Sequence, residues 1–289
     1  MNTYSVRVAA SSANLGTGFD AIGVALDWYD EATLLPGGDQ AKINLLGEGA
    51  ATLPSDESNL LVQALRRGVA EFGGQLGGFE LTCRNQIPQQ RGLGSSAGAI
   101  VAGLALGWAV SRGPELELAP LFQLAAEIEG HPDNVGAAVV GGAVLSWQPA
   151  SGPAELLQLP LAPGISFTLF VPQHFASTHQ ARAVLPTQVP HGDAVRQANR
   201  SALLVAALTM RPDLLPIATR DLLHQPFRRE LMPESMRLID QLQALGVAAA
   251  LSGAGPSVLA LGPCPKQQFP GFVAHELHLG DAVKVAQAR

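Results

Sequence analysis

The sequence predicts an α+β fold in two lobes, and three observations support this prediction. Hydrophobic residues make up 47% of the 289 residues and charged residues only 15%, so the chain can bury a substantial core. Segments with strand-like alternation and segments with helical spacing are mixed in both halves. A proline-rich stretch at residues 149–163 separates the halves. We therefore expect an N-terminal lobe over residues 1–150 and a C-terminal lobe over 151–289.

The N-terminal segment is expected to begin as a strand and then to turn. Residues 4–9 alternate between polar and apolar side chains, as a half-buried strand does. Residues 11–20 are polar and contain glycine, which predicts a loop that carries Asn14 and Asp20. The apolar run 21–26 then returns the chain to the core.

The later elements follow from the same rules. Strands are predicted at residues 41–46, 79–85, 137–147 and 166–171, and as a pair around the turn 252–256. Helices are predicted at residues 58–72 with Ser58 as a cap, and at 97–110, 116–129, 193–209, 214–223 and 233–245. The stretch 97–110 is the most apolar, but it is shorter than the roughly 20 residues that cross a bilayer. It is expected to be a buried helix, and no membrane partner is expected.

Charge and cysteine content exclude several classes of protein. The net charge is −6 and lysine and arginine do not cluster, so nucleic acid is not expected as a partner. Cys83 and Cys264 lie far apart and outside any metal-ligand pattern, which fits a reduced cytoplasm. The N-terminus does not have the charged and apolar segments of a secretory signal.

A glycine-rich segment at residues 88–97 carries the first chemical signal. Gly92 and Gly94 permit close backbone approach, and two serines follow where a helix is expected to begin. Helix N-termini bind anions, so this pattern favours phosphate. The alternative is an ordinary strand-to-helix turn in which Ser95 only caps the helix. A Walker loop is excluded because no lysine lies nearby, and a dinucleotide fingerprint is disfavoured because no acidic residue ends a strand about 20 positions later.

Three motifs in order resemble those of the GHMP kinases. The central motif is Pro-Gln-Gln-Arg-Gly-Leu-Gly-Ser-Ser-Ala at residues 88–97. The first is Ala-Ser-Ser-Ala-Asn-Leu-Gly-Thr-Gly-Phe-Asp at 10–20, and the third is Leu-Ser-Gly-Ala-Gly-Pro-Ser at 251–257. The resemblance implies an N-terminal lobe similar to the ribosomal S5 domain 2-like fold and a ferredoxin-like C-terminal lobe. ATP would lie between the lobes.

Further stretches resemble the homoserine kinases within that family. These are residues 129–135, 177–186 and 224–228, together with the first motif. The implied reaction is phosphorylation of L-homoserine by ATP on the route to threonine. A kinase for another small alcohol and a catalytically inactive metabolite sensor are the alternatives. A homodimer is one assembly that the sequence leaves open.

The resemblance also implies the nucleotide and metal contacts. Ser96 and a helix glutamate would bind Mg²⁺, with Glu129 preferred because it directly precedes Gly130 as the family's glutamate does, and Glu127 in reserve. The two glutamates are two residues apart and point to different helix faces, so at most one of them would serve. Asn59 would contact the adenine, and Gly253 and Gly255 would help to close the site. The phosphate contacts would come from the central motif: Pro88, Arg91, Gly92, Leu93, Gly94, Ser95, Ser96 and Ala97.

Homoserine itself requires three kinds of group. Its carboxylate needs a cationic fork, its ammonium an acid, and its hydroxyl a polar group that holds it in line with the γ-phosphate. The candidates are Arg182 and Arg228 for the carboxylate, Asp20 and Asp133 for the ammonium, and Asn14 and Asn134 for the hydroxyl, with His131 and Thr178 beside them. Asn14, Asn134 and Arg182 are the catalytic candidates, and no base is assigned. Each has a structural alternative: a surface ion pair for an arginine, a cap for Asp20, and a plain turn at residues 131–134.

Overall fold

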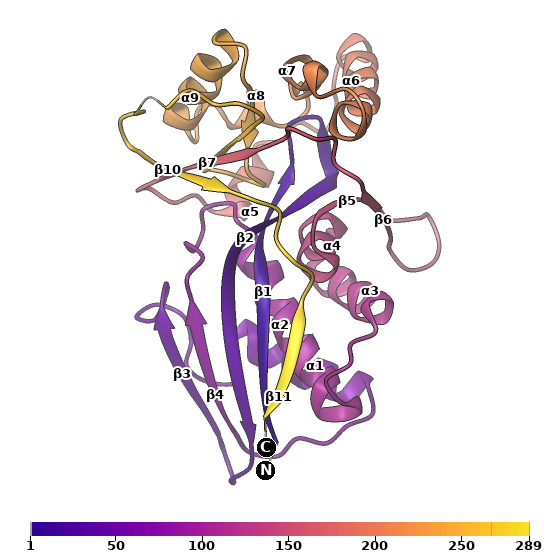
Figure 1. Ribbon diagram of the computed structural model, residues 1–289, viewed down its shortest axis with the longest axis vertical. Helices are drawn as coiled ribbons and strands as arrows, with labels where there is room; N and C mark the ends of the chain where they lie inside the picture. Colours follow the sequence, from indigo (N-terminus) through magenta and orange to yellow (C-terminus); the bar gives the residue numbers. More distant parts are fainter. Residues whose placement is uncertain (1, 267, 289) are drawn as a thin grey trace.

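The computed structural model describes residues 2–266 and 268–288, without the side chain of Thr178. Two β-sheets with attached helices lie one above the other along the long axis of the molecule (Figure 1). This arrangement confirms the predicted α+β fold. No helix in the described ranges is long and apolar enough to cross a membrane.

The larger sheet has seven strands and runs in the order β11-β1-β2-β4-β3, with β5 paired to β2 and β6 to β5. Only β3 and β4 pair in parallel, and the other pairs are antiparallel. The strands are β1 Thr3–Asn14, β2 Gly18–Pro36, β3 Ala41–Gly47, β4 Phe79–Asn85, β5 Ala143–Trp147, β6 Glu155–Leu159 and β11 Lys284–Ala288.

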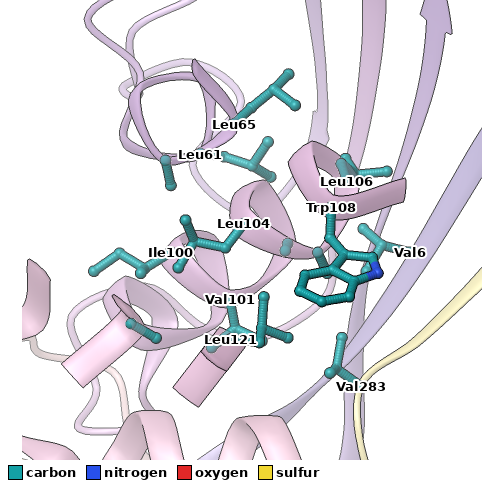
Figure 2. Packing of buried hydrophobic residues seen from close by; sticks show 14 of the residues in the cluster. Val6, Leu61, Leu65, Ile100, Val101, Leu104, Leu106, Trp108, Leu121 and Val283 are labelled. Atoms are coloured by element: carbon teal, nitrogen blue, oxygen red, sulfur yellow. The ribbon is translucent and has the colours of Figure 1, made fainter. Parts of the chain in front are cut away.

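Four helices pack against this sheet, and the largely buried α2 lies at their centre. They are α1 Leu60–Glu71, α2 Ser95–Arg112, α3 Leu118–Glu129 and α4 Pro132–Val140. Figure 2 shows Leu61 and Leu65 of α1 beside Leu104 of α2, and Trp108 facing Val6 of β1 and Val283, which directly precedes β11. Helices α1 and α2 approach closely, because a Cβ on Gly107 would lie 2.8 Å from the backbone nitrogen of Val69.

The smaller sheet has four antiparallel strands in the order β10-β7-β9-β8. They are β7 Phe167–Pro172, β8 Ala248–Leu251, β9 Val258–Leu261 and β10 Phe272–Leu277. The helical segments of this half are α5 Thr178–Ala183, α6 His191–Thr209, the 3₁₀ turn Pro212–Leu214, α7 Leu215–Ala218, α8 Gln225–Arg228 and α9 Pro233–Ala244.

The proline-rich stretch at residues 149–163 does not separate the strands of one sheet from those of the other. β6 and β11 come from the second half of the sequence but pair within the larger sheet. The chain therefore ends beside its own beginning, as the adjacent termini show (Figure 1). A domain boundary near residue 150 stays a prediction.

The turn between β1 and β2 reaches into the smaller lobe. The Thr17 hydroxyl donates to the carbonyl oxygen of Ala218 (2.6 Å). Leu15 is fully buried in a cluster that includes Leu208 and Ala218 of the smaller lobe. Gly16 has φ +82°, and a Cβ there would lie 2.8 Å from the carbonyl carbon of Thr219. This position therefore requires glycine.

Several predicted elements need correction. Residues 11–20 are not one loop, because β1 continues to Asn14 and β2 begins at Gly18, so Asp20 lies within a strand. Residues 137–140 belong to α4, since Pro132 and Asp133 begin a helix instead of a turn. Within 214–223 only Leu215–Ala218 is α-helical.

The cap of α1 also differs from the prediction. Asn59, not Ser58, is the N-cap, because its side-chain oxygen accepts from the Leu61 N–H (3.0 Å). Ser58 donates its hydroxyl to the carboxylate of Asp56 instead. Strands β6, β10 and β11 and the short helices α5 and α8 were not predicted at all.

The contact between α1 and α2 predicts different effects for two glycines of α2. Gly107→Ala would force backbone atoms of α1 apart, and we expect it to lower the free energy of unfolding by about 1–3 kcal/mol. A Cβ on Gly98 would meet nothing within 4 Å. Gly98→Ala should therefore raise stability by up to about 1 kcal/mol through helix propensity. Urea denaturation of both variants measures this, and equal effects would contradict the packing argument.

Candidate active site

The three motifs found in the sequence are joined by hydrogen bonds. The Ser252 hydroxyl donates to the carbonyl oxygen of Gly92 (2.7 Å) and lies 2.8 Å from the Ser12 hydroxyl. The Ser11 N–H donates to the carbonyl oxygen of Leu93 (3.1 Å), and the Gly253 N–H to that of Ala13 (3.0 Å). Segments more than 200 residues apart thus form one unit.

The glycine-rich loop leaves the N-terminus of α2 without a side-chain cap. Gly94 is the N-cap residue and has φ +68°, a left-handed conformation that favours glycine. The alternative in which Ser95 caps the helix is wrong, because Ser95 is the first helical residue and its hydroxyl points to the Pro88 carbonyl oxygen (3.5 Å). The first N–H groups of α2 therefore lie at the cavity without a capping acceptor, as an anion site requires.

A cavity of about 310 Å³ opens beside this loop. Its wall includes most of the predicted nucleotide contacts: Asn59, Arg91, Gly92, Leu93, Gly94, Ser95, Ser96 and Gly253. Pro88, Ala97 and Gly255 are not in the wall. Ala97 is instead fully buried in the core, and Gly255 packs closely against Met232.

Two of the wall residues have their polar atoms engaged. The Asn59 amide accepts from the Leu61 N–H and donates to the Pro54 carbonyl oxygen (2.8 Å). Arg91 directs its guanidinium at three backbone carbonyl oxygens. Neither side chain is directed at the cavity by these contacts.

Ser96 and Glu129 meet at the edge of the cavity. The Ser96 hydroxyl donates to Oε2 of Glu129 (2.9 Å). Burial raises the pKa of Glu129, while this hydrogen bond and the charge of Arg182 oppose the shift. Glu127 points elsewhere: it is 69% exposed and lies 3.4 Å from Arg67. Of the two glutamates, only Glu129 lies beside Ser96.

Asp20 and Arg182 form an ion pair next to the same region. Nη2 of Arg182 lies 2.7 Å from Oδ1 of Asp20, and both side chains are about one-third exposed. The guanidinium carbon of Arg182 lies over the Phe19 ring, 5.7 Å from the ring centroid. A positive and a negative group are therefore side by side and open to solvent.

Arg228 is buried, with 1% of its surface exposed. Nε donates to the Ala181 carbonyl oxygen (3.0 Å) and Nη1 to Nδ1 of His224 (2.9 Å). Burial, with the nearby charge of Arg182, lowers its pKa to about 10. The Phe19 ring stacks on the His224 ring, with 4.8 Å between the ring centroids. No role was predicted for either residue from the sequence.

The two candidate asparagines bond within the protein. Asn14 donates to the Gly253 carbonyl oxygen (2.8 Å) and accepts from the Asp20 N–H (3.0 Å). The Asn134 side chain accepts from the Ser11 hydroxyl (2.9 Å) and donates to Asp133 (3.3 Å). Both amides thus hold motifs together, and an orienting role toward substrate stays a prediction.

Asp133 and His131 lie at the start of α4. Asp133 is 2% exposed and accepts the Asn134 N–H at 2.7 Å. Burial raises the pKa of Asp133 to about 7. Burial and the charge of Arg182 lower the pKa of His131. The side chain of Thr178 lies outside the described part of the structure.

The raised pKa of Asp133 predicts a pH dependence of stability. An unfolded Asp titrates near 3.9, so between about pH 4 and 7 the native state holds one more proton than the unfolded chain. The free energy of unfolding should therefore fall as pH rises through this window, by at most about 1.4 kcal/mol per pH unit.

Asp133→Asn removes this titration but keeps the oxygen that accepts from Asn134. In urea denaturation over pH 4–8, the stability of this variant relative to the wild type should increase up to about pH 7 and then level off. A stability difference that does not change with pH would contradict the assignment.

Comparison with known proteins gives the same family over both lobes. The model of the GHMP kinases N terminal domain matches residues 59–142, and that of GHMP kinases C terminal matches 203–269. The structure is similar to a homoserine kinase from Cytophaga hutchinsonii, with a TM-score of 0.83 and 26% identity over 98% of this chain and 97% of that one. A mevalonate kinase from L. major, at 14% identity and a TM-score of 0.70 over 96% and 95% of the chains, shares the fold.

Curated relatives are more similar in sequence. A homoserine kinase from Cutibacterium acnes is 48% identical over 98% of both chains. One from Mycobacterium tuberculosis is 45% identical over 97% of this chain and 93% of its own length. With such similarity over nearly its full length, the chain belongs to the GHMP kinase family, in the group of the homoserine kinases.

Proposed function

We propose that this protein transfers the γ-phosphoryl group of ATP to the hydroxyl of L-homoserine, giving ADP and O-phospho-L-homoserine on the route to threonine. The observation that carries the proposal is the exposed Asp20–Arg182 pair, whose arginine charge acts on Glu129, the partner of Ser96 at the uncapped start of α2. A zwitterionic amino acid offers one charge to each member of this pair. Four relatives at 44–50% identity are named homoserine kinase.

The triphosphate would rest on the loop of Gly92 and Gly94 and on the N–H groups at the start of α2. Backbone donors and the helix dipole supply partial positive charge there. The adenine would enter the apolar part of the cavity, which Leu53, Leu60 and Leu61 help to line. Asn59 would shape this wall by capping α1.

A magnesium ion would bind at Ser96 and Glu129. Their oxygens lie 2.9 Å apart, and hydroxyl and carboxylate oxygens suit a hard cation. The described residues hold no cluster of three or more His, Cys, Asp or Glu side chains for a metal, so phosphate oxygens and water would complete the shell. When bound, the ion would neutralise charge on the transferring phosphoryl group.

In the substrate site, Asp20 would accept the ammonium and Arg182 would bind the carboxylate. Arg228 would act indirectly, because it bonds to His224 and to the carbonyl oxygen of Ala181, the residue before Arg182. Asn14 and Asn134 would orient the hydroxyl, as the sequence predicts, with His131 and Asp133 close to Asn134 in the chain. We assign no catalytic base, and positioning with charge stabilisation would supply the rate. A cytoplasmic location stays a prediction.

A substrate panel tests this function directly. ADP release should be measured with homoserine, serine, threonine, mevalonate and galactose, and we expect the highest kcat/KM with homoserine. Preference for an alcohol without a carboxylate would favour the alternative kinase. Absence of ADP release with every alcohol would favour the inactive sensor. In Arg182→Met, loss of a charged hydrogen bond should lower kcat/KM for homoserine by roughly tenfold to a hundredfold.

Two glutamates on one helix test the metal site. Glu129→Gln should raise the Mg²⁺ concentration needed for half-maximal rate at least about tenfold, because it removes the charged ligand. Glu127→Gln is the matched control, since Glu127 is exposed and pairs with Arg67. ADP release titrated with Mg²⁺ measures both. The same Mg²⁺ dependence in the two variants would refute the site.

A further inference from the structure

Arg91 lies in the phosphate loop, but its guanidinium points toward the smaller lobe. Nε donates to the carbonyl oxygen of Pro172 (3.0 Å) and Nη2 to that of Gln173 (2.5 Å). Nη1 donates to the carbonyl oxygen of Gln89 within the loop itself (3.1 Å). All three nitrogens therefore donate to backbone carbonyl oxygens, and these bonds use three of the five N–H groups of the guanidinium.

The residues that Arg91 holds lead directly to the substrate site. Pro172 ends β7, and residues 173–177 connect it to α5, which carries Arg182. The Ala176 N–H also donates to the carbonyl oxygen of Gln90 (3.3 Å), and Phe175 lies 5.5 Å from the guanidinium carbon of Arg91. The 173–177 connection is thus attached to the phosphate loop at its start, middle and end.

No other described contact of this kind holds the connection to the larger lobe. Arg182 itself bonds to Asp20, but that pair is about one-third exposed, and exposed ion pairs contribute little to stability. Ser177 caps α5 by accepting from the Gln180 N–H (3.5 Å), a bond within the helix. Within the smaller lobe, α5 is held by the bond from Arg228 to the Ala181 carbonyl oxygen (3.0 Å) and by the burial of Ala181. Arg91 and its neighbour Gln90 supply the hydrogen bonds that tie the connection before α5 to the phosphate loop.

We propose that Arg91 is a positioning residue that sets Arg182 for substrate by tying the 173–177 connection to the phosphate loop. The proposal rests on the proposed function, in which Arg182 binds the homoserine carboxylate. An arginine suits this role because its planar fork reaches several carbonyls at once, whereas the single ammonium of a lysine does not.

Two variants of Arg91 separate positioning from phosphate binding. In ADP-release assays, Arg91→Met should raise the KM for homoserine about tenfold while the KM for ATP stays within about twofold. Arg91→Lys keeps the charge but not the fork, so its KM for homoserine should stay raised as well. Arg66→Met is the matched control, because Arg66 also donates to two carbonyl oxygens, of Leu76 and Gly77, away from the site.

A second measurement needs no substrate. Hydrogen exchange of residues 173–183 should be at least several-fold faster in Arg91→Met and Arg91→Lys than in the wild type, and unchanged in Arg66→Met. Unaltered exchange in both Arg91 variants would show that Arg91 does not hold the 173–177 connection to the phosphate loop. This result is independent of whether homoserine is the substrate, so it separates failure of the tie from failure of the proposed function.

Two kinetic outcomes would also overturn the proposal. A raised KM for ATP that Arg91→Lys restores would make Arg91 a phosphate ligand. An equal fall in kcat for Arg91→Met, Arg91→Lys and Arg66→Met would leave Arg91 with a general structural role, if the KM values for ATP and homoserine were unchanged and the melting temperatures lower. If the wild type does not phosphorylate homoserine, the proposed function fails instead.

Discussion

The insertion of the β1–β2 turn into the smaller lobe is the constraint on which the site depends. Thr17 bonds to α7, and His224 lies 2.8 Å from the Gly16 carbonyl oxygen. Asn14, with φ +73°, bonds to Gly253. Because this turn is fixed from the smaller lobe while β1 and β2 form the centre of the larger sheet, the two lobes share one rigid element. The first motif is thereby held between the glycine-rich loop and the third motif, and Asp20 is placed just beyond the turn.

The same turn explains how an arginine can be buried in the smaller lobe. Burial lowers the pKa of His224, which favours its neutral form. A neutral imidazole can accept from Arg228 at Nδ1 and donate from Nε2 to the Gly16 carbonyl oxygen. Asp221 fixes the preceding backbone by accepting the N–H groups of His224 and Gln225. A buried charge is tolerated only with such partners. Arg228 is therefore held within the smaller lobe, whereas Arg182 is about one-third exposed, which is why Arg182 is the arginine proposed to bind the carboxylate.

Local sequence patterns predicted what depends on local chemistry. The buried α2, the glycine-rich loop and the hairpin β8–β9 have apolar runs or glycines that identify them. Residues 11–14 were predicted as loop because they are polar, yet they continue β1, since Ser11 and Ser12 find partners in Asn134 and Ser252. These partners lie more than 100 residues away, so no local pattern reveals them. The carbonyl bonds of Arg91 are hidden for the same reason, which is why the sequence suggested a phosphate contact there.

The charges of the cavity wall bear on the proposed binding of a metal ion and a nucleotide. Among the described residues of its wall, three side chains are acidic, Asp30, Glu31 and Glu129, and one is basic, Arg91. The guanidinium of Arg91 is already bonded to carbonyls, and the α2 dipole supplies only about half a positive charge. A triphosphate alone would therefore face more negative than positive charge. Burial raises the pKa of Glu129 even though the Ser96 hydrogen bond and the charge of Arg182 oppose the shift, so burial disfavours its charged form. A divalent cation bound at Ser96 and Glu129, as proposed, would relieve both problems together, so that cation and nucleotide would each strengthen the binding of the other by the same factor.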